Sequence, residues 1–377
     1  MKTKDRKSNF ELMRIISMLF IVLYHILVHG KILEHADGSI EVLLIFIESI
    51  LLVHVNSFIL VSGYFQSESN FKMGKFLKLN NMVWFYKVVI MLVLIWLGLI
   101  ATPDLITRIH TYFPIDYGIY WFMGSYLILY LISPILNKVI HNSNKKDLTK
   151  IIIILFIIIS ISSTFSMDIF INTQTGRTLQ TFILLYFIGA YIRKYPIDFS
   201  YFMQPFTKKA KRLIYFLIFM FCATFSTFCW LGYNHLVPLG NIAGEIGSIL
   251  GFAHISYASP IVILQSIAYA LFFNTLDFKN KFINKVAGCS LAVYLISENV
   301  YIREILYDKL GITQVTVISL SIVLKLLIIT LIIFAICTII EMLRQWIFKL
   351  IYNCKIAEKN RVWYRNYIKE LGININW

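Results

Sequence analysis

The sequence predicts an all-α integral membrane protein with about ten transmembrane helices and with both termini in the cytoplasm. Three observations support this prediction: the composition, the lengths of the apolar runs, and the distribution of lysine and arginine between them. Of the 377 residues, 58% are hydrophobic and only 15% are charged, whereas a soluble domain carries about 25% charged residues. A water-soluble fold could not bury this much apolar surface, so the composition predicts lipid as the solvent.

Ten apolar runs are near the length of about 20 residues that a helix needs to cross the hydrocarbon core of a bilayer. The sixth run is short, and a glycine- and serine-rich stretch over 244–251 before the eighth indicates a re-entrant piece or an earlier helix start. The first run follows four basic residues and lacks a cleavage site, which indicates an uncleaved signal anchor. The runs lie roughly at 10–29, 41–64, 82–101, 119–139, 149–166, 178–193, 212–231, 257–276, 287–306 and 319–343.

Lysine and arginine alternate between the segments that connect these runs. With the N-terminus placed inside, 27 of the 35 basic residues fall in the inner segments and 5 in the outer ones. This is the pattern of the positive-inside rule, so the net charge of +15 indicates orientation in a membrane rather than nucleic-acid binding. We therefore predict a membrane domain over 1–343 and a basic, aromatic cytoplasmic tail over 344–377 that lies on the inner leaflet.

The five cysteines do not predict a metal or redox site. They are scattered, mostly within apolar runs, and no pair has the spacing of zinc ligands or of a redox motif. We interpret them as small apolar packing residues and expect no bound metal.

The first predicted helix contains the residues most suited to chemistry. Charged groups within a membrane helix are costly and usually face a protein interior or a water-filled cavity. Arg14 and His25 are eleven residues apart, which places them on one face of a helix, within about 20° and about 16 Å apart along its axis. Glu11 lies three residues before Arg14 and can pair with it. Two alternatives stay open: Arg14 can extend to inner-leaflet phosphates, and His25 can be a polar packing residue.

This first run resembles the signature of a known family. Glu11, Arg14 and His25 match the pattern of an acidic residue, two others, arginine, ten residues and histidine in the membrane-bound acyltransferase-3 family. In the second run, Ser62-Gly63-Tyr64-Phe65 resembles the family's Ser-Gly-Phe/Tyr segment. Further segments that look like family pattern are 121–134, 187–193 and 290–296.

The chain departs from the family pattern in three places. Glu11 replaces the more common aspartate, and Asn56 stands near the place where many members have an acidic residue. Ser297 and Glu298 follow a late segment that often precedes a histidine. Glu298 is then either a group that lines a cavity or the partner of an interhelical ion pair, for which Lys325 is available.

The resemblance implies a bacterial O-acetyltransferase that acts on a cell-surface or exported polysaccharide, with acetyl-CoA as the donor. His25 is the candidate base or acyl carrier, with Glu11 beside it in the catalytic signature. Arg14, Ser62 and Gly63 are candidates for binding the donor, because a guanidinium suits phosphates. For Ser62 and Gly63 a packing contact between small residues is an equal alternative.

Asn56, Trp121 and Glu298 are the candidates for binding the acceptor. The outer loops are short, so a glycan or a lipid-linked sugar is expected to enter a cleft between helices. The expected partners are membrane lipid, acetyl-CoA and a carbohydrate, with no nucleic acid, in a multi-pass protein of the bacterial plasma membrane. The oligomeric state stays open, a homo-oligomer included.

Two other functions remain compatible with the sequence. A transporter, flippase or polymerase of lipid-linked glycans would also be basic inside and lined with buried charges, although no internal repeat is visible. Such a protein needs no acetyl-CoA, and this separates the two classes. An acyltransferase that transfers succinyl or another acyl group is the third possibility.

Overall fold

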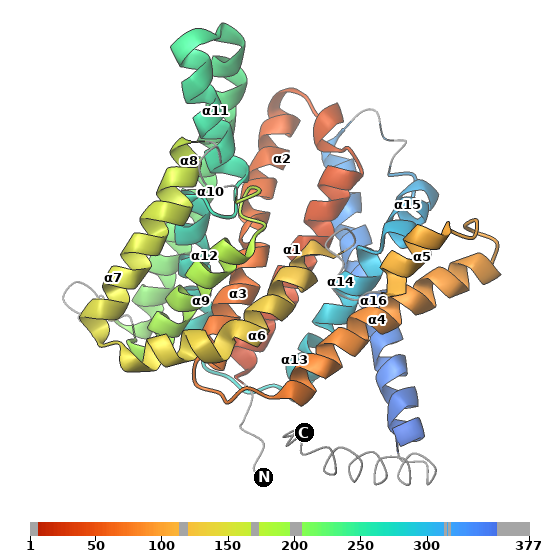
Figure 1. The fold of residues 1–377 in the computed structure, drawn as a ribbon. Helices are drawn as coiled ribbons and strands as arrows, with labels where there is room; N and C mark the ends of the chain where they lie inside the picture. Colours follow the sequence, from red (N-terminus) through yellow and green to blue (C-terminus); the bar gives the residue numbers. More distant parts are fainter. Residues whose placement is uncertain are drawn as a thin grey trace.

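The predicted all-α fold class is confirmed over the part of the chain that the structure describes. In this computed structural model the described residues form helices joined by short connections, without a β-strand (Figure 1). The described residues are 7–112, 120–166, 173–196, 206–312, 315 and 318–352.

The helices follow the chain in an order that Figure 1 shows by colour. Two of them, α8 and α13, span only a turn or two, and a π-helical segment (Phe156–Ser162) joins α7 to α8. The helices are α1 (Ser8–His29), α2 (Gly38–Leu51), α3 (Val53–Gln66), α4 (Met73–Trp96), α5 (Leu105–Tyr112), α6 (Trp121–Asn142), α7 (Lys145–Leu155), α8 (Ser163–Phe165), α9 (Leu179–Lys194), α10 (Lys208–Leu236), α11 (Asn241–Ile255), α12 (Pro260–Asn274), α13 (Lys281–Ala287), α14 (Ser290–Ser297), α15 (Val300–Lys309) and α16 (Leu320–Tyr352).

Eight helical stretches among the described residues are long and apolar enough to cross a membrane. They coincide with eight of the ten runs that the sequence predicts. The sixth run forms α9, a helix of only 16 residues. The ninth run is not one helix, because the backbone leaves the helical path between α14 and α15. The eight stretches are Ser8–His29, Gly38–Gln66, Met73–Trp96, Trp121–Asn142, Lys145–Phe165, Lys208–Leu239, Asn241–Asn274 and Leu320–Ile351.

Two helix boundaries in the structure differ from those that the sequence predicts. The glycine-rich stretch 244–251 is helical and belongs to α11, a separate helix that ends at Ile255 before α12 begins at Pro260. The third run begins at Met73 rather than near residue 82, because its first turns carry lysines that a search for apolar runs excludes. Those turns place two of the lysines next to the site described below.

The centre of the bundle is built on a close crossing of α3 and α9. A Cβ atom added to Gly63 would lie 2.2 Å from the carbonyl oxygen of Tyr186, and one added to Gly189 would lie 2.2 Å from that of Leu60. The two glycines therefore let the helix backbones touch. Helices α1 and α12 pack on the same α3.

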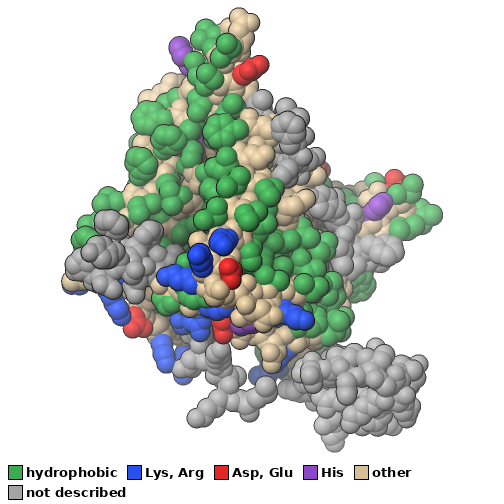
Figure 2. Space-filling view, turned by 60° about the vertical axis from the view of Figure 1, so that its left-hand side comes forward, with side chains coloured by type: hydrophobic (Ala, Val, Ile, Leu, Met, Phe, Trp, Pro, Cys, Tyr) green, Lys and Arg blue, Asp and Glu red, His purple; other side chains and the backbone are tan. Residues whose placement is uncertain are grey.

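Basic side chains gather at one end of the molecule, as Figure 2 shows for one face. At this end α1 begins and α3 and α9 end, and Lys7 and Arg193 both lie over the ring of Tyr64. This is the end that the positive-inside rule assigns to the cytoplasm, and the orientation stays a prediction. Residues 353–377 of the predicted tail lie outside the described part of the chain, and the part before them continues α16.

Candidate active site

One cavity of about 560 Å³ runs beside α1 and brings the predicted residues of that helix together. Glu11, Arg14 and His25 all line it, which confirms that they share one face of the helix. Further walls come from α3, α4, α6, α14 and α15. We call the part near Glu11 and Arg14 the Arg14 end, and the part near Glu298 the Glu298 end.

The Arg14 end is basic and open. The Nη1 atom of Arg14 lies 3.3 Å from both carboxylate oxygens of Glu11, so the predicted pair is formed. The Arg14 side chain remains 34% exposed. Lys75 and Lys78 of α4 line the same part of the cavity and are exposed. The cavity therefore has three cations at this end against one carboxylate, which suits an anionic ligand.

Ser62 also lines the cavity, whereas Gly63 does not. The Ser62 hydroxyl donates to the carbonyl of Phe58 (2.8 Å) and lies 3.3 Å from the hydroxyl of Tyr126, a second lining residue. Gly63 faces Tyr186 on α9, so its place corresponds to the packing alternative rather than to contact with a donor.

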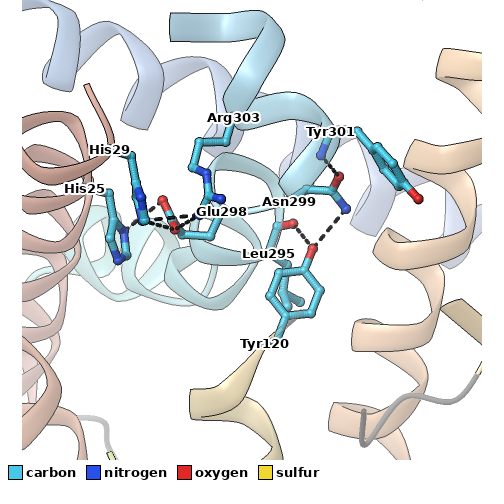
Figure 3. Close-up of polar contacts among 8 residues, drawn as sticks. All are labelled: His25, His29, Tyr120, Leu295, Glu298, Asn299, Tyr301 and Arg303. Atoms are coloured by element: carbon cyan, nitrogen blue, oxygen red, sulfur yellow. Dashed lines mark hydrogen bonds and ion pairs between the residues drawn. The ribbon is translucent and has the colours of Figure 1, made fainter. Parts of the chain in front are cut away.

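The Glu298 end contains a buried carboxylate surrounded by three basic side chains (Figure 3). Its Oε1 atom lies 2.8 Å from Nδ1 of His25, and Oε2 lies 3.8 Å from Nε2 of His29 and 3.7 Å from Nη1 of Arg303. The Glu298 side chain is 7% exposed and that of His25 is 15% exposed. A carboxylate buried this deeply is costly unless such partners compensate its charge. Glu298 thus lines the cavity and also forms an interhelical ion pair, but with these groups rather than with Lys325, which is exposed on α16.

The break between α14 and α15 is what places Glu298 at the cavity wall. Backbone groups that leave a helix inside a membrane need other partners. The Tyr120 hydroxyl donates to the carbonyl of Leu295 (2.6 Å) and accepts from Nδ2 of Asn299 (3.1 Å). Asn299 caps α15 by accepting a hydrogen bond from the backbone amide of Tyr301 (3.2 Å). Figure 3 shows this set beside the carboxylate.

Aromatic and polar side chains from distant segments line the wall between the two ends. Nδ1 of His54 lies 2.6 Å from the carbonyl of Leu51, which makes it the protonated nitrogen. Nε2 of His54 then accepts from the hydroxyl of Tyr257 (3.2 Å). The ring of Trp121 stacks on that of Tyr257, with centroids 6.3 Å apart and planes 18° apart. Trp121, predicted to bind the acceptor, lines the cavity, and Arg177 joins it from the segment before α9.

Asn56, the remaining predicted residue, is not among the lining residues. Its side chain is fully buried, and Nδ2 donates to the carbonyl of Tyr257 (2.9 Å). Asn56 therefore holds Tyr257 in place rather than facing an acceptor.

The group formed by His25, His29 and Glu298 has the spacing of a metal-ligand set, with all donor atoms within 4.8 Å of one another. Nη1 of Arg303, however, lies 3.2 Å from Nε2 of His29 as well as near the carboxylate. The guanidinium thus supplies the positive charge that a cation would supply, and the same donors are already engaged. The arrangement fits an ion-pair network better than a metal centre.

Comparison with known families decides the class of this protein. A family model described as an acyltransferase domain, of the acyltransferase-3 type, matches residues 7–342. The chain belongs to the acyltransferase-3 family. The match covers both ends of the cavity, and it establishes a membrane acyltransferase, as the signature in the first helix indicates. Searches of curated proteins and of solved structures gave no match.

Several residues of this acyltransferase site were not singled out from the sequence. Arg177 counted only as a charge of an outer loop, and Lys75 and Lys78 as charges of an inner one. His29 is the residue that the sequence could most readily have revealed, since it follows His25 by four residues and so shares its face of the helix. Spacing of this kind identifies neighbours on one helix, but not contacts between helices.

Proposed function

We propose that this acyltransferase moves an acetyl group from acetyl-CoA to a hydroxyl of a cell-surface or exported polysaccharide, or of its lipid-linked precursor. The supporting observation is that one continuous cavity joins a basic end at Arg14 to a histidine that lies beside a buried carboxylate. The positive-inside rule assigns the Arg14 end to the cytosol, where acetyl-CoA is found. We place the protein in the bacterial plasma membrane.

The Arg14 end suits the donor. Coenzyme A carries phosphates, and guanidinium and ammonium groups bind phosphates by charge-assisted hydrogen bonds. Arg14, Lys75 and Lys78 provide these groups, and Ser62 provides a hydroxyl farther along the wall. Glu11 orients Arg14 through the pair at 3.3 Å. Gly63 acts in this scheme only by allowing the helices to pack closely.

His25 suits the chemical step. In one route its free ring nitrogen removes the proton of the acceptor hydroxyl while the oxygen attacks the acetyl carbon. In the other, the nitrogen first takes the acetyl group, which then passes to the hydroxyl. In both routes the thioester C–S bond breaks, an O–C ester bond forms, and the hydroxyl proton balances the thiolate as CoA thiol. Both routes require that the donor and the acceptor reach the imidazole ring of His25 within the cavity.

The wall near Trp121 suits a carbohydrate. Sugar rings pack on aromatic faces, and the Trp121–Tyr257 pair offers such a face beside hydrogen-bonding groups. Glu298 lies at the far end of the same wall. The acceptor then approaches from the end opposite to Arg14.

The test compares O-acetyl groups in surface glycans of cells with and without the gene. Cells that make Arg14→Ala or His25→Ala at normal protein level are expected to lose these groups. Cells that make His235→Ala, a change at an exposed histidine of α10, are the matched control and are expected to keep them. Wild-type acetylation in His25→Ala cells would overturn the role of His25.

A second measurement separates this function from the transport of lipid-linked glycans. Purified full-length protein in lipid nanodiscs is expected to bind acetyl-CoA and to release CoA thiol. Protein that does neither favours a transporter or flippase. Faster release of CoA thiol from succinyl-CoA than from acetyl-CoA would indicate an acyltransferase that transfers succinyl instead of acetyl groups.

A further inference from the structure

Glu298 occupies an unusual place for a carboxylate. Nδ1 of His25 and Oε1 of Glu298 are both buried, lie 2.8 Å apart, and have no other hydrogen-bonding partner among the described residues. The two groups are within reach of a hydrogen bond but are not yet aligned for one, which is common for catalytic groups without substrate. The rest of the His25 ring lines the cavity.

The other carboxylate oxygen is turned toward different groups. Oε2 faces Nη1 of Arg303 at 3.7 Å and Nε2 of His29 at 3.8 Å. Arg303 therefore attracts one oxygen of Glu298 by its charge, which leaves Oε1 for His25. A carboxylate at Nδ1 favours the tautomer in which Nδ1 carries the proton and Nε2 keeps its lone pair.

The helix break gives Glu298 this position. In an unbroken helix the carbonyl of Leu295 would accept from the amide of Asn299. Here that amide bonds to the carbonyl of Ile296 instead (3.3 Å), and the hydroxyl of Tyr120 takes the freed carbonyl of Leu295. Because the same hydroxyl accepts from the Asn299 side chain, Tyr120 joins both sides of the break.

We propose that Glu298 is a positioning residue that fixes the tautomer of His25, and that the hydroxyl of Tyr120 holds the break that places Glu298. This inference rests on the proposed function, because it assigns Nε2 of His25 as the atom that meets the acetyl group. Glu298 acts through His25 rather than on a substrate. Tyr120 acts one step further away, through the backbone.

The substitution Glu298→Gln tests the tautomer directly. Arg303 can only donate, so it holds the amide oxygen and turns the amide NH₂ toward His25. Nδ1 must then accept, and the proton moves to Nε2. We expect the CoA-release kcat of full-length protein in nanodiscs to fall at least ~100-fold, with the KM for acetyl-CoA within about twofold. The kcat of Glu298→Asp is expected to be about tenfold higher than that of Glu298→Gln.

A matched glutamate serves as the control for Glu298→Gln. Glu304→Gln makes the same change at an exposed glutamate of α15 and is expected to keep the wild-type kcat. Glu298→Gln with a wild-type kcat, or a loss explained by a fall in unfolding temperature that Glu298→Asp shares, overturns the role.

Tyr120→Phe tests the break. It removes the hydroxyl and is expected to lower kcat about tenfold at unchanged KM. Combined with Glu298→Gln it should add little, since both act through His25. Tyr191→Phe, which removes a hydroxyl that lies 3.4 Å from Thr149 and away from the cavity, is the control. Effects of Tyr120→Phe and Glu298→Gln that multiply overturn the link between them.

A measurement without acetyl-CoA keeps the inference separate from the proposed function. ¹⁵N spectra of histidine-labelled protein, assigned through His25→Gln, are expected to show the proton on Nδ1 in wild type and on Nε2 in Glu298→Gln. A wild-type proton on Nε2, or no change in the variant, overturns the inference. Absence of CoA release by wild type with the expected spectra overturns the proposed function alone.

Discussion

The two ends of the cavity are built in different ways. At the Arg14 end the groups come in local pairs: Glu11 with Arg14 on α1, and Lys75 with Lys78 on α4, each three residues apart. At the Glu298 end the local contact of Arg303 with Glu298 is joined by contacts between distant segments, such as Arg303 to His29 across 274 residues and Tyr120 to Leu295 across 175. The difference suggests that the first end tolerates substitution and that the second does not.

Exposure points in the same direction. Cations at the Arg14 end keep contact with water, which screens their attraction for a ligand. The Glu298 carboxylate is buried, so the loss of one partner leaves a charge without compensation. Five substitutions test this contrast, and they are ordered from the largest expected effect to the smallest.

His25→Ala should have the largest effect. Removing the ring removes both the base and the acyl carrier, so we expect kcat for CoA release in nanodiscs to fall by ~10³-fold or more. His235→Ala, at an exposed site, should keep the wild-type rate. A loss of less than tenfold in His25→Ala would remove the distinction between the two ends.

Arg14→Ala should act on binding more than on the chemical step. We expect the KM for acetyl-CoA to rise by about 10- to 100-fold, because a charge-assisted contact to phosphate is lost, while kcat falls less. Arg14→Lys keeps the charge but not the planar guanidinium. Its KM for acetyl-CoA should lie between those of the wild type and of Arg14→Ala. A fall in kcat alone would place Arg14 with the catalytic group instead.

Gly63→Ala should act on stability through the packing of α3 on α9. The added Cβ would meet the carbonyl of Tyr186 at 2.2 Å, so we expect a loss of about 1–3 kcal/mol in the free energy of unfolding. Thermal unfolding in nanodiscs measures it. Gly244→Ala, where the nearest atom is 3.4 Å away, is the control and should be neutral or stabilising. A normal unfolding temperature with a raised KM for acetyl-CoA would return Gly63 to the donor site.

Lys75→Ala and Lys78→Ala should have the smallest effects. Each is expected to raise the KM for acetyl-CoA about three- to fivefold at low salt, and the effect should shrink in high salt because exposed charges are screened. Lys281→Ala changes an exposed lysine that does not line the cavity and should leave KM unchanged. An effect that does not depend on salt would argue against a simple electrostatic role.

Much of the Arg14 end could be predicted from the sequence. Helical spacing is local, so a separation of eleven positions suffices to place Arg14 and His25 on one face. The same reasoning explains the limits of the prediction. Gly63 follows the family pattern and Asn56 departs from it, yet the packing of α3 turns Gly63 toward α9 and Asn56 toward the backbone of Tyr257.

The sequence by itself determined the class of fold, the membrane as solvent and the face of the first helix, because hydropathy and helical periodicity act along the chain. The tertiary structure decided where the ninth run breaks and which groups meet Glu298. That break depends on a hydroxyl from Tyr120, and the carboxylate is held by side chains from α1 and α15. No local pattern encodes such contacts, since they exist only when packed helices exclude other partners.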